Sequence, residues 1–400
     1  MLKKYPAIYT DFYELTMAQG YFLSGRKNET AVFDYFFRKI PFKGGFVVFA
    51  GLGDFLELLK DYRFHTEEIE YLRTQGFKEP FLSYLEEFSF QGDIYSAKEG
   101  EVVFSNTPLI RVEGAIIETQ IIETLLLNII NFESLIATKA ARIREAAGKR
   151  LVLDFGLRRS QGFGGIQASK ASVIGGLNGS SNVYAGLVHG LNVSGTMAYL
   201  SKKARKQLDD AGFPEIKIAA SNQLDEYLIK SLLDQKAPID IFGVGTKLVT
   251  AYDNPALDGV YKLASINNKP TLKISENVEK ITLPGIKKVT RYLNKDGSFY
   301  ADGISLESES KTTHIEHPYF PTKRTRVEDL DSELLLTKIV EKGKLLIDIP
   351  NANESAEYCK QQIQKLSPEY KRFDNPHVYK IGITKELKSL RDQIIKTHSN

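Results

Sequence analysis

This chain has little of what marks several classes of protein. It has a single cysteine, Cys359, so no intramolecular disulfide can form, and such scarcity is typical of a reducing compartment. Its formal net charge of +3 is small for 400 residues, which argues against a nucleic-acid or membrane-surface partner. The six histidines are scattered without the spacing of metal ligands, so the sequence predicts no histidine metal centre.

Long hydrophobic runs are also lacking. The most apolar run, Ile121–Ile130, is interrupted by Glu123 and Asn128 and is too short to span a bilayer. Lys3 and Lys4 are not followed by the apolar segment of a signal peptide. We find no internal repeat and no low-complexity tract. We therefore expect a cytoplasmic protein.

What is present is an ordinary globular composition, with 42% hydrophobic and 26% charged residues in a chain long enough for two domains or one large α/β domain. In the first third, apolar spacing predicts helices over Tyr9–Phe22, Gly51–Tyr62 and Glu118–Ala147. Strands are predicted over Ala31–Ile40 and within Glu99–Val112.

From Leu151 onward, short β-branched runs alternate with helical segments. The runs are Leu151–Asp154, Ile216–Ala219, Ile239–Phe242 and Val260–Leu263, with helical patterns such as Tyr199–Ala211 and Leu224–Gln235 between them. This repetition predicts a parallel sheet or barrel with sites at the carboxyl ends of its strands. Further on come an Asp296-Gly297 hairpin signal and charged helices near Asn353–Leu366 and Thr384–Lys396.

The densest group of chemically suggestive residues runs from Asp154 to Met197. Arg158 and Arg159 stand just after a β-branched run, and a segment rich in glycine, serine and asparagine follows over Gly175–Asn182. Such residues suit an anion, either phosphate or carboxylate. Two arginines at a strand end are also common in structural ion pairs, and the sequence leaves that alternative open.

Segments spread over nearly the whole chain resemble the nicotinate phosphoribosyltransferase family. No single segment suffices, but their order and spacing together are specific. They are Thr10–Met17, Phe36–Lys39 with Gly44–Phe46, Asp154–Arg159, Val193–Met197, Phe242–Thr246, Gly259–Leu263, Lys273–Ser275 and Leu283–Gly285.

The resemblance implies an enzyme that joins nicotinate to 5-phosphoribosyl diphosphate, releases pyrophosphate and couples the reaction to ATP hydrolysis, with Mg²⁺ present. It implies small-molecule partners, no nucleic acid or membrane, and a homodimer that builds its site across subunits. The implied fold is α/β, an irregular barrel as in type II phosphoribosyltransferases with a smaller N-terminal α/β domain. We expect an N-terminal domain over 1–148, a shortened and incomplete barrel over 149–275, and a C-terminal β/α region over 276–400 that packs on both.

The chemistry explains why anion-binding groups are needed. Breaking the bond between ribose C1 and pyrophosphate creates an oxocarbenium-like centre, so the protein has little covalent work to do. It must hold the polyanion, align the pyridine nitrogen and stabilise the developing charge.

Four residues are implied as the phosphoribosyl site. Gly243, Gly245 and Thr246 follow a predicted strand, where glycines let backbone N–H groups approach a phosphate and Thr246 adds a hydroxyl. A lone Gly-x-Gly is also an ordinary strand–helix turn, and the matching flanks favour the functional interpretation. Arg158 is implied as the cation of this site more strongly than Arg159.

Four further residues are implied as the nicotinate site: Tyr13, Phe155, Ser181 and Thr196. Tyr13 would stack on the pyridine ring in the neighbouring subunit's site and Phe155 on its opposite face, although an aromatic residue in this segment also suits core packing. Ser181 stands where nicotinamide-using relatives carry an acidic residue, which would repel the carboxylate of nicotinate. Lys262 is either a phosphate partner or a solvent-exposed lysine.

The chain departs from the family after Met197. There the family continues Ala-His-Ser, whose histidine is phosphorylated by ATP, and then through motifs with an arginine for the nicotinate carboxylate and acidic residues for ribose and Mg²⁺. This chain continues Ala198-Tyr199-Leu200, which resembles a later helix of the family. The sequence therefore predicts an internal deletion of about two βα units, of roughly 30 residues each.

Two hypotheses follow. The first is a nicotinate phosphoribosyltransferase that works without ATP. The second is a catalytically impaired or inactive paralogue that binds phosphoribosyl ligands or partner subunits. Tyr13, Arg158 and Ser181 favour the first, and the missing histidine, arginine and aspartate motifs favour the second.

Overall fold

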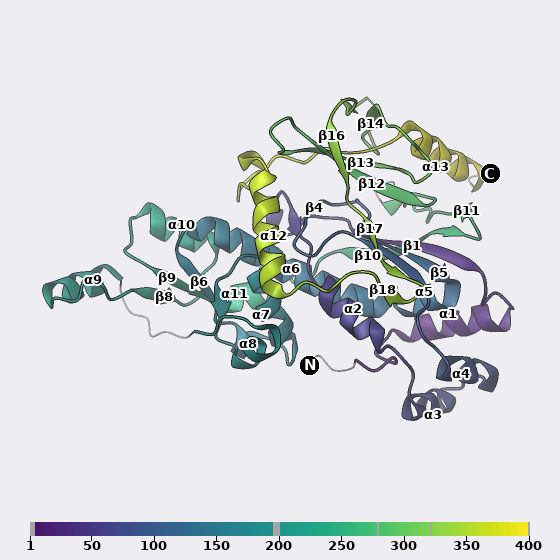
Figure 1. The fold of residues 1–400 in the computed structure, drawn as a ribbon, viewed down its shortest axis with the longest axis horizontal. Helices are drawn as coiled ribbons and strands as arrows, with labels where there is room; N and C mark the ends of the chain where they lie inside the picture. The colour runs from purple at the N-terminus through teal and green to yellow at the C-terminus, as the bar shows by residue number, and fades with distance from the viewer. Residues whose placement is uncertain (1–4, 195–200, 278–279, 321, 399–400) are drawn as a thin grey trace.

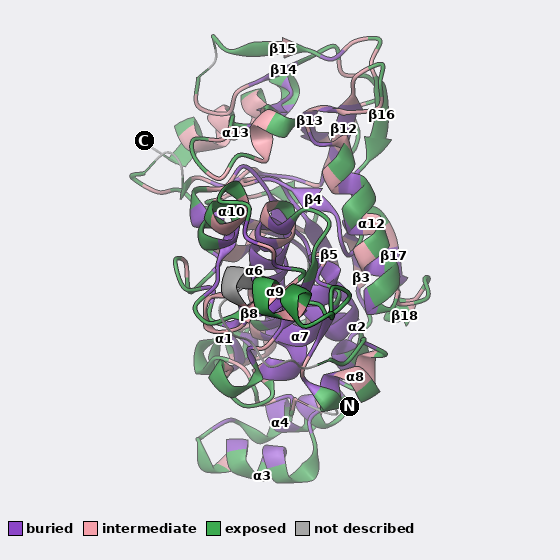
Figure 2. Cartoon of the chain, turned by 90° about the vertical axis from the view of Figure 1, so that its left-hand side faces the viewer, coloured by how far each residue is buried: buried purple, intermediate pink, exposed green. Residues whose placement is uncertain are grey.

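The computed structural model describes all of the chain except residues 1–4, 195–200, 278–279, 321 and 399–400, and the side chains of 201–203 (Figure 1). The described residues form a seven-stranded sheet, a six-stranded sheet, a four-stranded sheet and a small two-stranded ladder. Helices separate and cover these sheets, and the buried residues concentrate in the middle of the molecule (Figure 2).

The seven-stranded sheet is antiparallel and has β1 (Thr30–Phe37) near its centre. β1 pairs with β10 on one side, Tyr35 opposite Tyr261, and with β5 on the other. In spatial order its strands are β11 (Lys269–Pro270), β10 (Gly259–Ile266), β1, β5 (Ile110–Ala115), β3 (Asp93–Ser96), β17 (Thr337–Glu341) and β18 (Lys344–Leu345).

This sheet draws strands from all three predicted regions, so the sheets do not follow the division at 148 and 275. The predicted strand Val260–Leu263 lies inside β10 and pairs antiparallel with β1. The expectation that it continues the parallel βα series is therefore wrong. An apolar strand pattern specifies a strand but not the strand it pairs with.

The core is organised around one long helix. The predicted helix Glu118–Ala147 is divided at Ile122 into α5 (Ile116–Ile121) and α6 (Glu123–Ala147), and Gly148 ends it with a φ of +59°. The combined helix is long and apolar enough to cross a membrane, but 72% of its most apolar stretch is buried inside the protein. It contacts α2 (Leu52–Lys60), α7 (Gly164–Ile174) and α10 (Glu226–Asp234).

The four-stranded sheet is parallel, as the βα repetition predicted. In spatial order its strands are β7 (Gly179–Ser180), β6 (Leu151–Asp154), β9 (Ile241–Val244) and β8 (Ala219–Ser221). β8 begins three residues later than predicted. The strands do not close on themselves among the described residues, so the sheet is a half-barrel, which confirms the predicted incomplete barrel.

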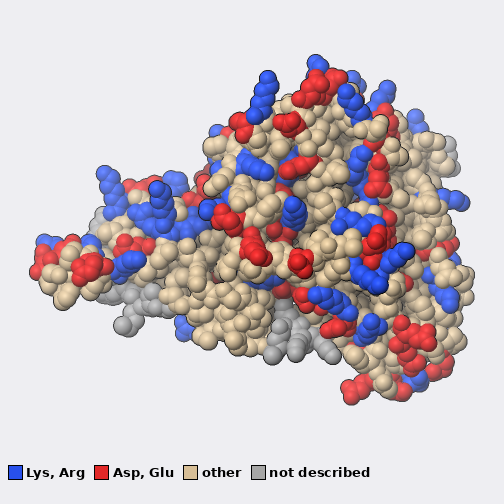
Figure 3. Space-filling view, in the orientation of Figure 1, with Lys and Arg blue, Asp and Glu red and all other residues tan. Residues whose placement is uncertain are grey.

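The two edges of the half-barrel are β7 and β8. A single parallel bridge, Ser180 to Val193, extends the β7 edge. Helix α8 (Val183–His189) lies between the two bridged residues, and α9 (Ser201–Asp210) comes later in the chain. α9 projects to the far left of Figures 1 and 3 with charges of both signs, and Arg205 holds it to the carbonyl oxygens of Phe213 and Ile216 at 2.7 and 2.6 Å.

The six-stranded sheet forms the top of the molecule in Figure 1. Its strands are β15 (Arg324–Arg326), β14 (His314–Glu316), β19 (Ile381–Ile383), β13 (Phe299–Leu306), β12 (Lys287–Leu293) and β16 (Asp331–Leu334). β12 and β13 form the predicted hairpin around Gly297, whose φ is +80°. The predicted C-terminal helices are α12 (Ala352–Lys365), which packs on α7, and α13 (Lys385–His398).

The two-stranded ladder pairs β2 (Val47–Val48) with β4 (Val102–Val103). Three helices lie at the lower right of Figure 1: α1 (Phe12–Leu23), α3 (Thr66–Thr74) and α4 (Glu79–Glu86).

Candidate active site

The carboxyl ends of β7, β6 and β9 bring together most of the predicted site residues on this chain. Ser181 follows β7, Phe155 follows β6, and Gly245 follows β9. β6 pairs with both other strands, and the backbone N–H of Ser181 donates to the Asp154 carbonyl oxygen at 2.8 Å. This is the edge of a parallel sheet at which α/β proteins place their ligands.

Phe155 is held tightly against β9. Its backbone N–H donates to the Val244 carbonyl oxygen at 2.6 Å. Its ring lies over Gly243, where an added Cβ would stand 2.4 Å from a ring carbon. Gly243 therefore has a packing reason to lack a side chain, because any side chain would displace the ring.

The turn after β9 is narrow for a similar reason. A Cβ on Gly245 would lie 3.3 Å from the Phe155 carbonyl oxygen, and Thr246 starts the one-turn helix α11 (Thr246–Val249). The next residue, Lys247, forms an ion pair with Asp225, which caps α10 by accepting from the Leu228 N–H at 2.8 Å. The Lys247 ammonium lowers the pKa of Asp225 by hydrogen bonding and charge, against the effect of burial. This pair ties the β9 turn to the segment after β8.

Arg158 and Arg159 lie in the 3₁₀ turn Leu157–Arg159, which Gly156 separates from Phe155, and both are exposed. Within the described ranges neither arginine is in an ion pair, so the structural alternative raised by the sequence finds no support there. The 3₁₀ turn contacts α11, so the turn that carries Arg158 and Arg159 lies next to the helix that begins at Thr246.

Tyr13 lies elsewhere on the chain. It is 46% exposed on α1 and lines a pocket of about 340 Å³ that also includes Glu14, Thr124, Phe132 and residues 255–257. Burial, with help from the charges of Glu123 and Glu14, raises the pKa of Tyr13. Phe155 is not among the residues lining this pocket, so one chain does not bring the two predicted stacking residues together.

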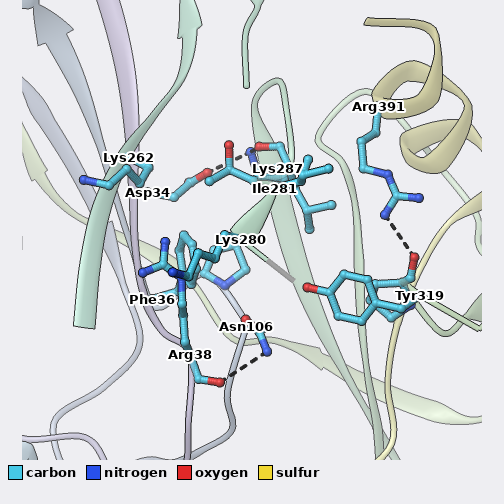
Figure 4. Close-up of a pocket in the computed structure, with 14 residues that line it drawn as sticks. Asp34, Phe36, Arg38, Asn106, Lys262, Lys280, Ile281, Lys287, Tyr319 and Arg391 are labelled. Atoms are coloured by element: carbon cyan, nitrogen blue, oxygen red, sulfur yellow. Dashed lines mark hydrogen bonds and ion pairs between the residues drawn. The ribbon is translucent and has the colours of Figure 1, made fainter. Parts of the chain in front are cut away.

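A second cluster of cations lines a narrow pocket of about 30 Å³ between β1, β10 and the C-terminal sheet (Figure 4). It contains Arg38, Lys262, Lys280 and Arg391, with Lys287 paired to Asp34 at 2.7 Å. The Arg38 Nε is buried without a hydrogen-bond partner in the described structure. Lys262 lies 3.5 Å from Glu123, so it is not a free solvent-exposed lysine.

The described residues contain no group of three or more histidine, cysteine, aspartate or glutamate side chains placed to hold a metal ion.

Two family models match the chain. The nicotinate phosphoribosyltransferase N-terminal domain matches residues 8–131, and the C-terminal domain of the same enzyme matches residues 286–391. The Bacillus subtilis nicotinate phosphoribosyltransferase is 36% identical, with 97% of this chain and 95% of the relative covered. The chain belongs to the nicotinate phosphoribosyltransferase family.

Other relatives in this family agree. The Dictyostelium discoideum nicotinate phosphoribosyltransferase is 32% identical over 94% of this chain and 86% of the relative. The crystal structure of human nicotinic acid phosphoribosyltransferase superposes with a TM-score of 0.82 at 25% identity and covers 96% of this chain and 99% of the human one. The predicted α/β fold and family are thereby confirmed.

The comparison with the Bacillus enzyme also bears on the missing block. That alignment is 465 positions long but includes only 97% of a 400-residue chain, or about 388 residues, so the relative has residues at about 77 positions where this chain has none. The predicted place of this loss, after Met197, lies outside the described residues. So does Thr196, the fourth predicted nicotinate contact.

The sequence reasoning missed two sets of polar residues. Arg38 stands in a segment that carries the family resemblance, and its charge was the available signal. Ser169 and Ser180 contact the buried carboxylate of Asp154. Serines in a helix and at a strand end carry no sequence signal of that kind, because the contact depends on tertiary packing.

Proposed function

We propose that this chain forms nicotinate mononucleotide and pyrophosphate from nicotinate and 5-phosphoribosyl diphosphate, as a step of NAD biosynthesis. The carrying observation is the pairing of β6 with β9, which sets Phe155 and Arg158 beside the Gly245–Thr246 turn. An aromatic face, a cation without an ion pair to a described residue and a backbone turn at Gly245 are what a pyridine ring and a phosphorylated sugar need.

The division of labour follows from the chemistry. The pyridine nitrogen forms a bond to ribose C1 while the C1–oxygen bond breaks and pyrophosphate leaves with the electron pair. Phe155 holds one face of the ring, and Arg158 with the backbone after β9 holds the anionic groups. Ser181 leaves room for the nicotinate carboxylate, which an acidic residue there would repel.

Mg²⁺ fits this scheme as an ion brought by the diphosphate. The described residues offer no protein cage, and Mg²⁺ usually binds through one or two carboxylates together with substrate phosphates. The ion would neutralise the leaving pyrophosphate. ATP use is not part of the proposal, because the phosphorylatable histidine of the family has no counterpart after Met197 in this sequence.

The proposal includes a homodimer in the cytoplasm. Tyr13 is half exposed on α1, a helix that also exposes the apolar residues Phe12, Met17 and Leu23. Because Tyr13 does not reach Phe155 within one chain, a partner's Tyr13 is the natural second face of the nicotinate site. The reducing environment suits the one buried thiol, Cys359.

A second function is favoured by a specific observation, the open half-barrel together with about 77 missing positions. A chain that has lost part of the wall around its site can still bind a phosphoribosyl group without turning it over. The alternative is therefore a binding paralogue that has kept β6 and β9.

One experiment separates the two. Purified protein is incubated with nicotinate, 5-phosphoribosyl diphosphate and Mg²⁺, with and without ATP, and nicotinate mononucleotide is measured by chromatography. Product without ATP supports the enzyme proposed here. Binding of 5-phosphoribosyl diphosphate with no product supports the paralogue, and stimulation through a phosphorylated histidine contradicts the predicted deletion.

A further inference from the structure

The ends of β6 and β7 are fastened by a carboxylate that no substrate can reach. Asp154 is the last residue of β6 and is 1% exposed. Its Oδ1 accepts from the Gly156 N–H at 2.7 Å, across the turn that carries Phe155. Its Oδ2 accepts from the hydroxyls of Ser169 at 2.8 Å and Ser180 at 2.7 Å.

Ser169 Oγ lies 2.8 Å from Asp154 Oδ2 and 2.9 Å from the Gly165 carbonyl oxygen, so these two acceptors share its single hydroxyl proton; the other hydrogen bonds of this cluster can be made together with the bond to Asp154. Ser180 donates to Asp154 and accepts from the Asn182 N–H at 3.0 Å. Ser169 donates to Asp154 and accepts from the Asn182 side-chain amide at 3.3 Å. Asn182 also caps α8 by accepting from the Ala185 N–H at 3.1 Å. We call Asp154, Ser169, Ser180 and Asn182 the Asp154 cluster.

The Asp154 cluster connects the two strands that present Phe155 and Ser181, two of the predicted nicotinate contacts. Asp154 precedes Phe155, and Ser180 precedes Ser181. Ser169 belongs to α7, which packs on the core helix α6. The ends of β6 and β7 are therefore held through α7 against the core helix α6.

Stability alone is a weak reason for this arrangement. No cation pairs with Asp154 in the described part of the chain, and burial raises the pKa of its carboxyl while the hydroxyl and N–H donors lower it. A buried charge without a counter-ion is costly, whereas a directional acceptor for three donors fixes geometry.

We infer that Asp154 is a positioning residue, which sets the distance and angle between Phe155 and Ser181 through the Gly156 N–H and the Ser169 and Ser180 hydroxyls. It does not touch substrate. The inference rests on the proposed function, because it concerns the nicotinate site. Misplacing a binding group by about 1 Å is enough to weaken a site strongly.

The chain offers a closely matched control. Ser169 and Ser172 both lie on α7, and both are fully buried. Both hydroxyls can donate to the carbonyl four residues earlier in the helix, Ser172 to Ala168 at 2.6 Å and Ser169 to Gly165 at 2.9 Å, and Ser169 alone of the two also donates to Asp154. Ser169→Ala and Ser172→Ala each remove one buried hydroxyl, so a purely structural effect would be alike in both.

The test measures nicotinate and 5-phosphoribosyl diphosphate binding by calorimetry, and thermal unfolding, for the native chain, Asp154→Asn, Ser169→Ala, Ser180→Ala and Ser172→Ala. We expect Ser169→Ala and Ser180→Ala to weaken nicotinate binding by roughly tenfold, with Ser172→Ala unchanged and Ser169→Ala and Ser172→Ala unfolding at similar temperatures. Asp154→Asn should have the largest effect.

Two outcomes would overturn the inference in distinguishable ways. Equal nicotinate affinity of Ser169→Ala and Ser172→Ala shows that the Asp154 cluster only stabilises the fold. If the native chain binds neither ligand, the proposed function is contradicted, and so is the positioning role that rests on it.

Discussion

The antiparallel sheets and the parallel half-barrel differ in the burial and pairing of two arginines, Arg291 and Arg158. In the antiparallel sheets buried cations are paired, as Arg291 is with Asp302 at 2.9 Å and Glu101 at 2.6 Å. At the carboxyl ends of the half-barrel, Arg158 is exposed and without an ion pair to a described residue. The comparison teaches that the buried cation Arg291 serves the fold, whereas Arg158, unlike the neighbouring Lys247 that pairs with Asp225, remains available to a ligand.

The largest effect should come from breaking a buried pair. Arg291 is fully buried between β12, β13 and the β4 region, so Arg291→Met leaves Asp302 and Glu101 without their counter-ion. We expect a loss of about 3–5 kcal/mol in the free energy of unfolding, measured by urea denaturation. Arg326→Met, which removes an exposed pair with Glu328 on the same sheet, is the control and should leave the midpoint unchanged. Equal losses of stability in the two variants would show that the buried pair contributes no more than the exposed one.

A buried carboxyl near Tyr13 should make stability depend on pH. Glu14 is fully buried, accepts from Thr10 and Thr124, and burial raises its pKa to about 7 from 4.5. The folded state thus binds the proton more tightly than the unfolded chain, so this group lowers stability as pH rises from 4.5 to 7.

Glu14→Gln removes that dependence. The variant should match the native chain near pH 4.5 and exceed it above pH 7 by up to about 3 kcal/mol, since one pKa unit corresponds to about 1.4 kcal/mol. Urea denaturation at several pH values measures the difference. A constant difference across this range would show that Glu14 does not titrate as stated.

The close packing of Phe155 on β9 can be tested at Gly243. Gly243→Ala puts a Cβ 2.4 Å from the Phe155 ring, so the ring must move. We expect a loss of about 1–3 kcal/mol in stability together with weaker nicotinate binding. Gly20→Ala, at a helical glycine with open space around it, is the control and should stabilise slightly. Unchanged nicotinate affinity in Gly243→Ala would separate Phe155 from the site.

The smallest expected effect concerns the free cation of the half-barrel. Arg158→Ala should weaken 5-phosphoribosyl diphosphate binding about tenfold, or about 1.4 kcal/mol, because a charge-assisted contact to an anion is lost. Its unfolding should not change, since no described residue pairs with it. Arg159→Ala is the matched comparison and should weaken binding less. A destabilised Arg158→Ala variant would place this arginine with the structural cations.

Local periodicity predicted most elements. The helices α1, α2, α10, α12 and α13, the strands β1, β6 and β9, and the β12–β13 hairpin all lie close to the predicted positions. The long predicted helix breaks at Ile122, which no proline or glycine announces. The family resemblance was also readable, because its motifs are contiguous in the sequence.

The sequence did not predict which strands pair or which side chains pack together. The strand at Val260–Leu263 had the right pattern for a strand, but only the packed chain shows that it joins β1 and not the parallel series. The motif predicts Gly243 as a phosphate-binding glycine, whereas the Phe155 ring over it gives it a packing role that the motif does not reveal.

The sequence by itself determined the elements, the family and the list of anion-binding candidates, because helix and strand periodicity and short motifs are local properties of the chain. The tertiary structure decided which candidates meet. It placed Phe155, Ser181 and Gly245 on neighbouring strands, left Tyr13 on a separate helix, and buried Asp154 among hydroxyls. Those outcomes depend on strand order and on contacts between residues distant in sequence, which no local pattern encodes.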